Sequence, residues 1–160
     1  MIFNRATKKR GESTMFYGME IGMDYGKAMD LFGNVTKKHN DHGGISWFKA
    51  VPKEKEWGIY PILQVTGRDG KIIEILASAD WDFYGKSCPH DKNKAESIMR
   101  KCVFHAESEY GTPTKSEYGK RIWDMEDGTR IKIKLVKSIG YDVNIRIFRQ
   151  DMPATMPESV

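Results

Sequence analysis

Two cysteines and two histidines form the pattern Cys88-x-His90 and Cys102-x-x-His105. Thiolate sulfur and imidazole nitrogen are ligands of tetrahedral Zn²⁺ sites. The second pair lies three residues apart on a predicted helix, and could therefore share a helix face. The first pair is spaced more tightly than the usual two to four residues, and Cys102 falls on an apolar stripe, where cysteine acts as a small hydrophobe. Metal binding is therefore the lesser alternative, and we expect no cofactor.

Basic residues alternate with apolar ones along two segments near the C-terminus. Over 129–136 the outward positions are Arg130, Lys132 and Lys134, and over 143–149 they include Arg146 and Phe148. A basic face with one aromatic ring suits phosphates and a stacked base. The competing interpretation is a charged outer face that keeps an antiparallel sheet soluble. Nucleic-acid binding is therefore the alternative function.

The least regular interior segment, 79–92, contains three closely spaced aromatic residues: Trp81, Phe83 and Tyr84. Exposed aromatic residues of this kind anchor protein interfaces, whereas buried ones would plug the junction between two halves. The chain contains no phosphate-binding GxxxxGK[ST], no GxGxxG, no GxSxG and no HExxH. We therefore expect a non-enzymatic module that binds another protein through its open sheet face and the segment around Tyr84.

The elements that must position these residues occur twice along the chain. A short helix capped by Asp24 and closed by Gly33 precedes one set of strands. A longer helix, capped by Asp91 or Asn93 and ended by Gly111, precedes a second set. The longer helix carries one apolar face, formed by Ala95, Ile98, Met99, Cys102, Ala106 and Tyr110.

Two Asp-Gly turns between apolar runs predict hairpins, one at 67–70 and one at 126–128. The first hairpin is apolar on both faces, which places it near the centre of a sheet. Residues 37–44 are polar and are predicted to form a loop.

These patterns predict an α+β fold of two α-β-β-β units, with a mostly antiparallel sheet, helices on one face, and the two units burying each other's apolar sheet faces. The predicted organisation is a basic arm (1–14), a first unit (15–80), a linking segment (81–92), a second unit (93–150) and a tail (151–160).

The segment 16–33 resembles the opening of the small α/β units in the BamE/SmpA lipoproteins and in the β-lactamase-inhibitor-protein-like fold. Gly22, Met23, Leu31 and Gly33 carry the resemblance. It implies a helical segment packed on a three-stranded meander, in tandem in the inhibitor-like members, and a tendency to bind proteins. Those families are typically exported, whereas here we expect no leader and no lipobox cysteine.

Composition sets the remaining expectations. With 160 residues, 39% hydrophobic and 30% charged, the chain is typical of a globular protein that folds without disulfides or metals. A net charge of +4 favours contact with anions without requiring it. Two cysteines and no apolar leader favour the cytoplasm and no membrane partner. A homodimer is left open.

Overall fold

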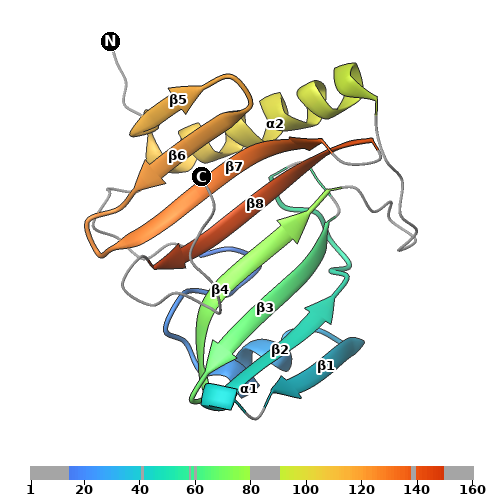
Figure 1. Cartoon of the computed structure of the whole chain (residues 1–160), viewed down its shortest axis with the longest axis vertical. Helices are drawn as coiled ribbons and strands as arrows, with labels where there is room; N and C mark the ends of the chain where they lie inside the picture. The colour runs from blue at the N-terminus through green and yellow to red at the C-terminus, as the bar shows by residue number, and fades with distance from the viewer. Residues whose placement is uncertain are drawn as a thin grey trace.

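The computed structural model describes residues 15–40, 42–57, 59, 61–79, 91–137 and 140–149. They form one antiparallel sheet of eight strands in the order β1-β2-β3-β4-β8-β7-β6-β5, with a long helix packed on it (Figure 1). The elements in chain order are α1 (Tyr25–Met29), β1 (Val35–Asn40), a 3-10 turn (His42–Gly44), β2 (Ile45–Ala50), β3 (Ile62–Arg68), β4 (Lys71–Ser78), α2 (Lys92–Tyr110), β5 (Lys115–Glu117), β6 (Lys120–Asp124), β7 (Thr129–Lys137) and β8 (Tyr141–Arg149).

One face of the sheet is a continuous apolar surface. A single row of cross-strand partners runs from β2 to β6 and consists of Phe48, Val65, Ile75, Ile147, Ile131 and Trp123. All six are buried in one hydrophobic cluster. Side chains at paired positions lie on the same face, so the row shows that both halves share one core.

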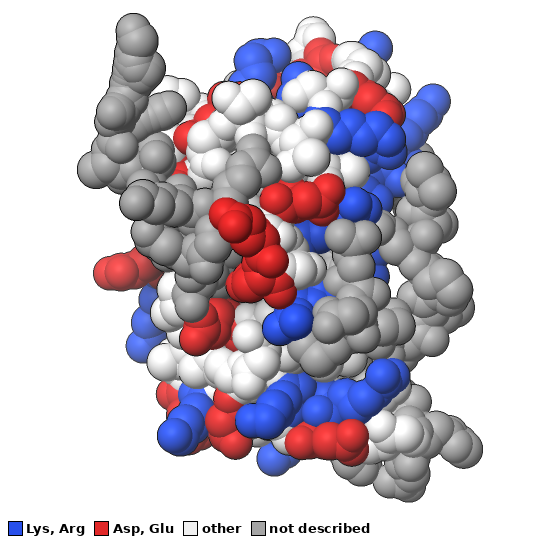
Figure 2. All heavy atoms as spheres, turned by 90° about the vertical axis from the view of Figure 1, so that its left-hand side faces the viewer, with Lys and Arg blue, Asp and Glu red and all other residues white. Residues whose placement is uncertain are grey.

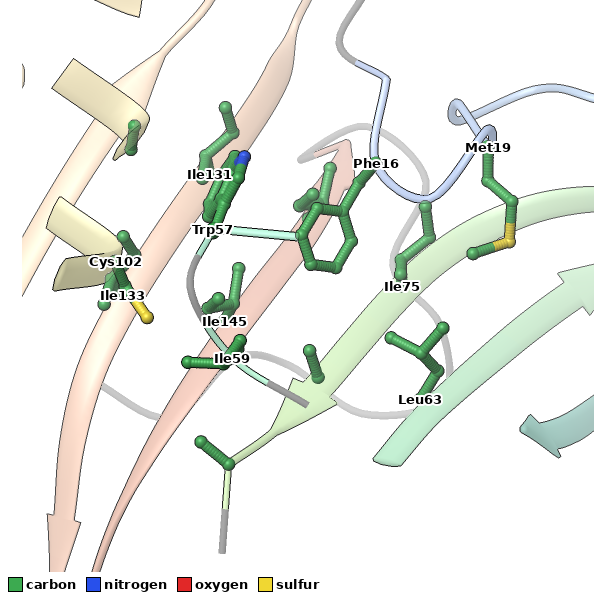
Figure 3. Packing of buried hydrophobic residues seen from close by; sticks show 14 of the residues in the cluster. Phe16, Met19, Trp57, Ile59, Leu63, Ile75, Cys102, Ile131, Ile133 and Ile145 are labelled. Atoms are coloured by element: carbon green, nitrogen blue, oxygen red, sulfur yellow. The ribbon is translucent and has the colours of Figure 1, made fainter. Parts of the chain in front are cut away.

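Both helices cover this apolar face. α2 packs on β7 and β8, and Cys102 of α2 lies beside Ile133 of β7 (Figure 3). Around α1, the rings of Tyr25 and Phe32 lie 5.5 and 6.0 Å from that of Phe48. Both described helices therefore lie on one face, as predicted, and the described part of the chain places no helix on the opposite face.

The ends of α2 follow the sequence signals. Asp91 is the N-cap and accepts a hydrogen bond from the Lys94 N–H at 2.7 Å, while Gly111, with φ of 80°, ends the helix. The predicted apolar stripe is buried except for half-buried Ile98. The caps set where α2 begins and ends, and the apolar stripe sets which side of the helix faces the sheet.

Asp69 and Gly70 both have positive φ, the backbone of a tight two-residue hairpin turn between β3 and β4. This hairpin occupies the third and fourth places of the eight-stranded order, near the sheet centre, as predicted.

Several sequence-based expectations are wrong. Each helix is followed by four strands rather than three, because β1 occupies part of the predicted 37–44 loop and β5 was not anticipated. α1 ends at Met29 with Asp30 as C-cap, four residues before the next glycine. The two halves do not bury each other's sheet faces; they join edge to edge, because β4 pairs with β8.

Within the described residues, no helix is long and apolar enough to cross a membrane. The predicted arm, most of the linking segment and the tail lie outside the described residues.

Candidate protein-binding groove

A groove of about 480 Å³ lies between α2 and the β5–β6 hairpin. We call it the α2 groove. α2 packs on β7 and β8, and the groove lies beside it, where the turn of the β5–β6 hairpin approaches the helix. Its lining comes from α2, the hairpin and β7 and consists of Glu96, Met99, Arg100, Val103, Phe104, Glu107, Tyr118, Gly119, Arg121 and Leu135.

The hairpin turn forms one wall because it extends the pairing of β6 with β7 by one position. Gly119 has φ of 71°, and its carbonyl accepts a hydrogen bond from the Leu135 N–H at 2.8 Å. A Cβ at this glycine would lie at ordinary contact distance from Leu135, 3.4 Å from its Cβ, so the positive φ rather than lack of space is what favours glycine here. Leu135 thereby becomes part of the groove lining.

Polar contacts hold the wall in place. The Tyr118 hydroxyl donates to Glu96 of α2 at 2.7 Å, and the Lys92 ammonium lies 5.7 Å from the Tyr118 ring. The bond to Glu96 stabilises the neutral hydroxyl and raises the pKa of Tyr118. Arg121 donates to the backbone carbonyls of Glu117 and Lys120 and so steadies the turn itself.

Two aromatic side chains stand on the rims with most of their surface in solvent. Phe104 on α2 is 66% exposed and Tyr118 on the hairpin is 73% exposed, the two most exposed large hydrophobic residues among those described. Between them the groove lining includes Met99, Val103 and Leu135. The arrangement offers aromatic anchors beside an apolar surface, with charged side chains around it.

The helix rim carries charges of both signs. Arg100 and Glu107 are both exposed, and the side chain of neither makes a hydrogen bond or ion pair with a described residue. A partner can therefore pair with these side chains without first displacing an internal contact.

The residues of the predicted basic face lie next to one another on β7 and β8, although two of its arginines already form ion pairs. Cross-strand pairing joins Arg130 to Phe148, and Lys132 to Arg146, on the side of the sheet away from the helices. Arg130 forms a two-pronged ion pair with Asp124 at 2.7 and 3.2 Å, and Arg146 pairs with a neighbouring glutamate, Glu74.

The ring expected to stack a base is not available in this structure. Phe148 is 5% exposed, and the Arg146 guanidinium lies 4.2 Å from its ring centre. Lys132 is also buried, and Lys134 is half-buried. The expectation that Phe148 and Lys132 face solvent is therefore wrong, since both side chains are buried although they lie on the face away from the helices.

Charge on the side of the molecule that carries the β5–β6 hairpin is mixed. Figure 2 shows Asp and Glu side chains gathered in the middle of this side, with Lys and Arg above and below. No field of a single sign covers the described residues in this view, so steering of a polyanion here would be weak.

Of the four predicted zinc ligands, Cys102 and His105 are described, and they do not share a face. Cys102 is a free thiol, fully buried against β7, and burial raises its pKa to about 12 (Figure 3). His105 is exposed. Cys88 and His90 lie outside the described residues, and the described residues contain no group of three or more His, Cys, Asp or Glu placed to hold a metal.

Trp81, Phe83 and Tyr84 also lie outside the described residues, so their role stays a prediction. Sequence reasoning missed Phe104 and Tyr118 instead. The available signal was the position of Phe104: it lies on the helix but off the buried stripe, where an aromatic residue has no core to fill.

We found no family model, no curated protein and no solved structure that matches this chain.

Proposed function

We propose that this protein is a non-enzymatic protein-interaction module that binds its partner in the α2 groove. The observation that carries the proposal is the pair of exposed aromatic residues, Phe104 and Tyr118, on either rim of a groove with an apolar lining. Apolar patches of this kind mark interaction sites on folded proteins, and aromatic anchors contribute much of the binding energy at interfaces.

The anatomy of the groove supports this use. Its apolar centre, formed by Met99, Val103 and Leu135, would be desolvated by a partner, while Arg100 and Glu107 at the rim would set orientation. Because the hydrogen bond between Tyr118 and Glu96 holds the two walls together, the groove exists before the partner arrives. Preformed sites lose less conformational entropy on binding.

Nucleic-acid binding through the basic face is the second candidate. Its support is the register that brings Arg130, Lys132, Lys134 and Arg146 to adjacent positions on β7 and β8. The ion pairs with Asp124 and Glu74 and the covered ring of Phe148 favour the first proposal.

A capture experiment separates the two candidates. The tagged full-length chain is incubated with native lysate, with and without nuclease, at low and moderate salt. We expect a protein partner that survives both treatments and that is lost with the double substitution Phe104→Ala and Tyr118→Ala. Material lost with nuclease, or falling steeply with salt, would contradict the proposal in favour of the basic face.

The matched control removes exposed apolar surface elsewhere. Leu31 and Val51 are 51% and 41% exposed and lie outside the groove. The variant Leu31→Ala and Val51→Ala should capture the partner as well as the original chain does. Equal loss in both double variants would indicate non-specific adhesion.

We also propose that the two halves arose by duplication of one helix-plus-four-strand unit. The support is the sheet order: each half contributes a four-stranded meander, and their last strands, β4 and β8, meet in the middle. The BamE/SmpA-like resemblance remains part of this proposal, since it implies tandem units.

A further inference from the structure

The exposed side of α2 carries a seam with the spacing of a helix–helix interface. Glu96, Arg100, Val103 and Glu107 follow one another at intervals of four, three and four residues, and all four line the α2 groove. This is the alternation with which one helix presents a stripe to another. The core stripe of α2 consists of Ala95, Met99, Cys102, Ala106 and Tyr110, so the seam lies one residue further round the helix, on the flank next to the packing on the sheet.

The order of charges along this seam is complementary to the same seam read in the opposite direction, as it is in an antiparallel second copy. If two copies of α2 lie antiparallel about a point between Val103 and Phe104, Arg100 of each copy faces Glu107 of the other. The same alignment places Val103 against Phe104 at the centre. Both charged side chains have no partner among the described residues of their own chain.

We infer that the partner of the α2 groove is a second copy of this chain, bound through an antiparallel α2 pair with two-fold symmetry. The inference rests on the proposed function, and it names the partner. Two-fold symmetry makes every contact twice, so the dimer has two Arg100–Glu107 pairs and brings the two grooves face to face. Phe104 of each copy then covers Val103 of the other and leaves solvent.

The charge order also selects the register. Sliding one helix by one step of the seam would place Glu96 opposite Glu107 and Arg100 opposite Val103. Like charges would then meet twice, and the arginine would face an apolar side chain, which is unfavourable. The alignment centred between Val103 and Phe104 pairs opposite charges and puts apolar groups together in the middle.

A charge-reversal cycle tests this pairing. Sedimentation velocity over a range of concentrations gives the dimer dissociation constant of the full-length chain and of three variants: Arg100→Glu, Glu107→Arg, and both together. Each single change turns two attractive contacts into two repulsive ones, and should raise the dissociation constant about tenfold or more. The double variant restores both pairs and should return it to within a few-fold of the original. The control Lys101→Glu makes the same charge change one residue away, outside the groove, and should have little effect.

The possible outcomes test separately whether the partner is a second copy and whether the α2 groove is a binding site. A chain that is monomeric throughout, a dimer insensitive to the single reversals, or a double variant that is not restored would overturn the second-copy inference. If the monomeric chain still captures another protein and loses it with Phe104→Ala and Tyr118→Ala, the proposed function stands with a different partner. If that double variant changes neither capture nor dimerisation, both proposals fail.

Discussion

Tyr17 and Tyr110 differ in the hydrogen bonding of their hydroxyl groups. Tyr17 sits in the left-handed region at φ of 53°, and its hydroxyl accepts from the Glu56 N–H at 2.7 Å and donates to the Ile59 carbonyl at 3.2 Å. Tyr110 is 2% exposed, and its hydroxyl has no hydrogen-bond partner among the described residues.

Removing each hydroxyl should therefore have opposite effects on stability. Tyr17→Phe leaves the part-buried Glu56 N–H without its acceptor and should lower the free energy of unfolding by about 1 kcal/mol. Tyr110→Phe removes an unsatisfied polar atom and should leave stability unchanged or raise it by up to about 1 kcal/mol. Urea denaturation of both variants measures the difference; equal losses would show that the Tyr110 hydroxyl has a partner after all.

Cys102 gives a pH-dependent prediction. Burial raises the pKa of this thiol from 9.0 to about 12, so between these values the unfolded chain ionises while the folded chain does not. Its contribution to stability is therefore complete below pH 9 and is lost as the pH rises. Tyr110 shifts in the same direction, so the comparison must isolate the cysteine.

The test is the cost of Cys102→Ala at two pH values. At pH 10 the original chain should have lost about 1 kcal/mol that the alanine variant cannot lose. The cost of the substitution should therefore be smaller by that amount at pH 10 than at pH 8, as measured by denaturant unfolding. A cost independent of pH would mean that the thiol is already accessible in the folded protein.

At the scale of the elements, α1 packs closely on the sheet at a glycine of β3, Gly67. A Cβ added to Gly67 of β3 would lie 2.5 Å from the ring of Tyr25 on α1, so the ring occupies the space that a side chain would need. Gly67→Ala should push the two elements apart and destabilise the fold by about 1–3 kcal/mol. Gly33→Ala is the matched control, because nothing lies within 4 Å there and φ is not positive. Thermal unfolding that ranks the two equally would contradict the close packing of α1.

The sequence predicted the elements whose signals are local. The capped helix α2 and the Asp69-Gly70 turn carry side-chain and backbone preferences that act within a few residues. The edge strands β1 and β5 were missed because edges are polar: β1 reads VTKKHN and β5 reads KSE. Their strand structure comes from pairing with β2 and β6, which is a tertiary contact.

At the scale of the whole molecule, one sheet with a single covered face explains where binding surface remains. The core links both halves: Phe16 of the N-terminal segment packs at 5.0 Å from Trp57, which lies 6.2 Å from Tyr110 at the end of α2 (Figure 3). α2 covers β7 and β8, and the sheet extends beyond it to β5. The α2 groove lies between α2 and the β5–β6 hairpin on this part of the sheet.

This also explains why the site could not be predicted from the sequence. The residues of the groove come from α2, the β5–β6 hairpin and β7, and only the strand order brings them together. The basic face was predicted correctly as a set of neighbours on β7 and β8. Its ion pairs were not, since Glu74 comes from β4, in the other half of the chain.

The most direct test of the account is site-specific photocrosslinking from the helix rim of the groove. Replacing Phe104 with benzoyl-phenylalanine in the full-length chain, and irradiating it in native lysate, should give a covalent protein adduct; an adduct of twice the chain mass would identify a second copy. The same probe in place of exposed Lys101, or of exposed Lys49 on the opposite face of the sheet, should give little or none. No protein adduct from position 104, or equal adducts from all three positions, would contradict a binding site in the α2 groove.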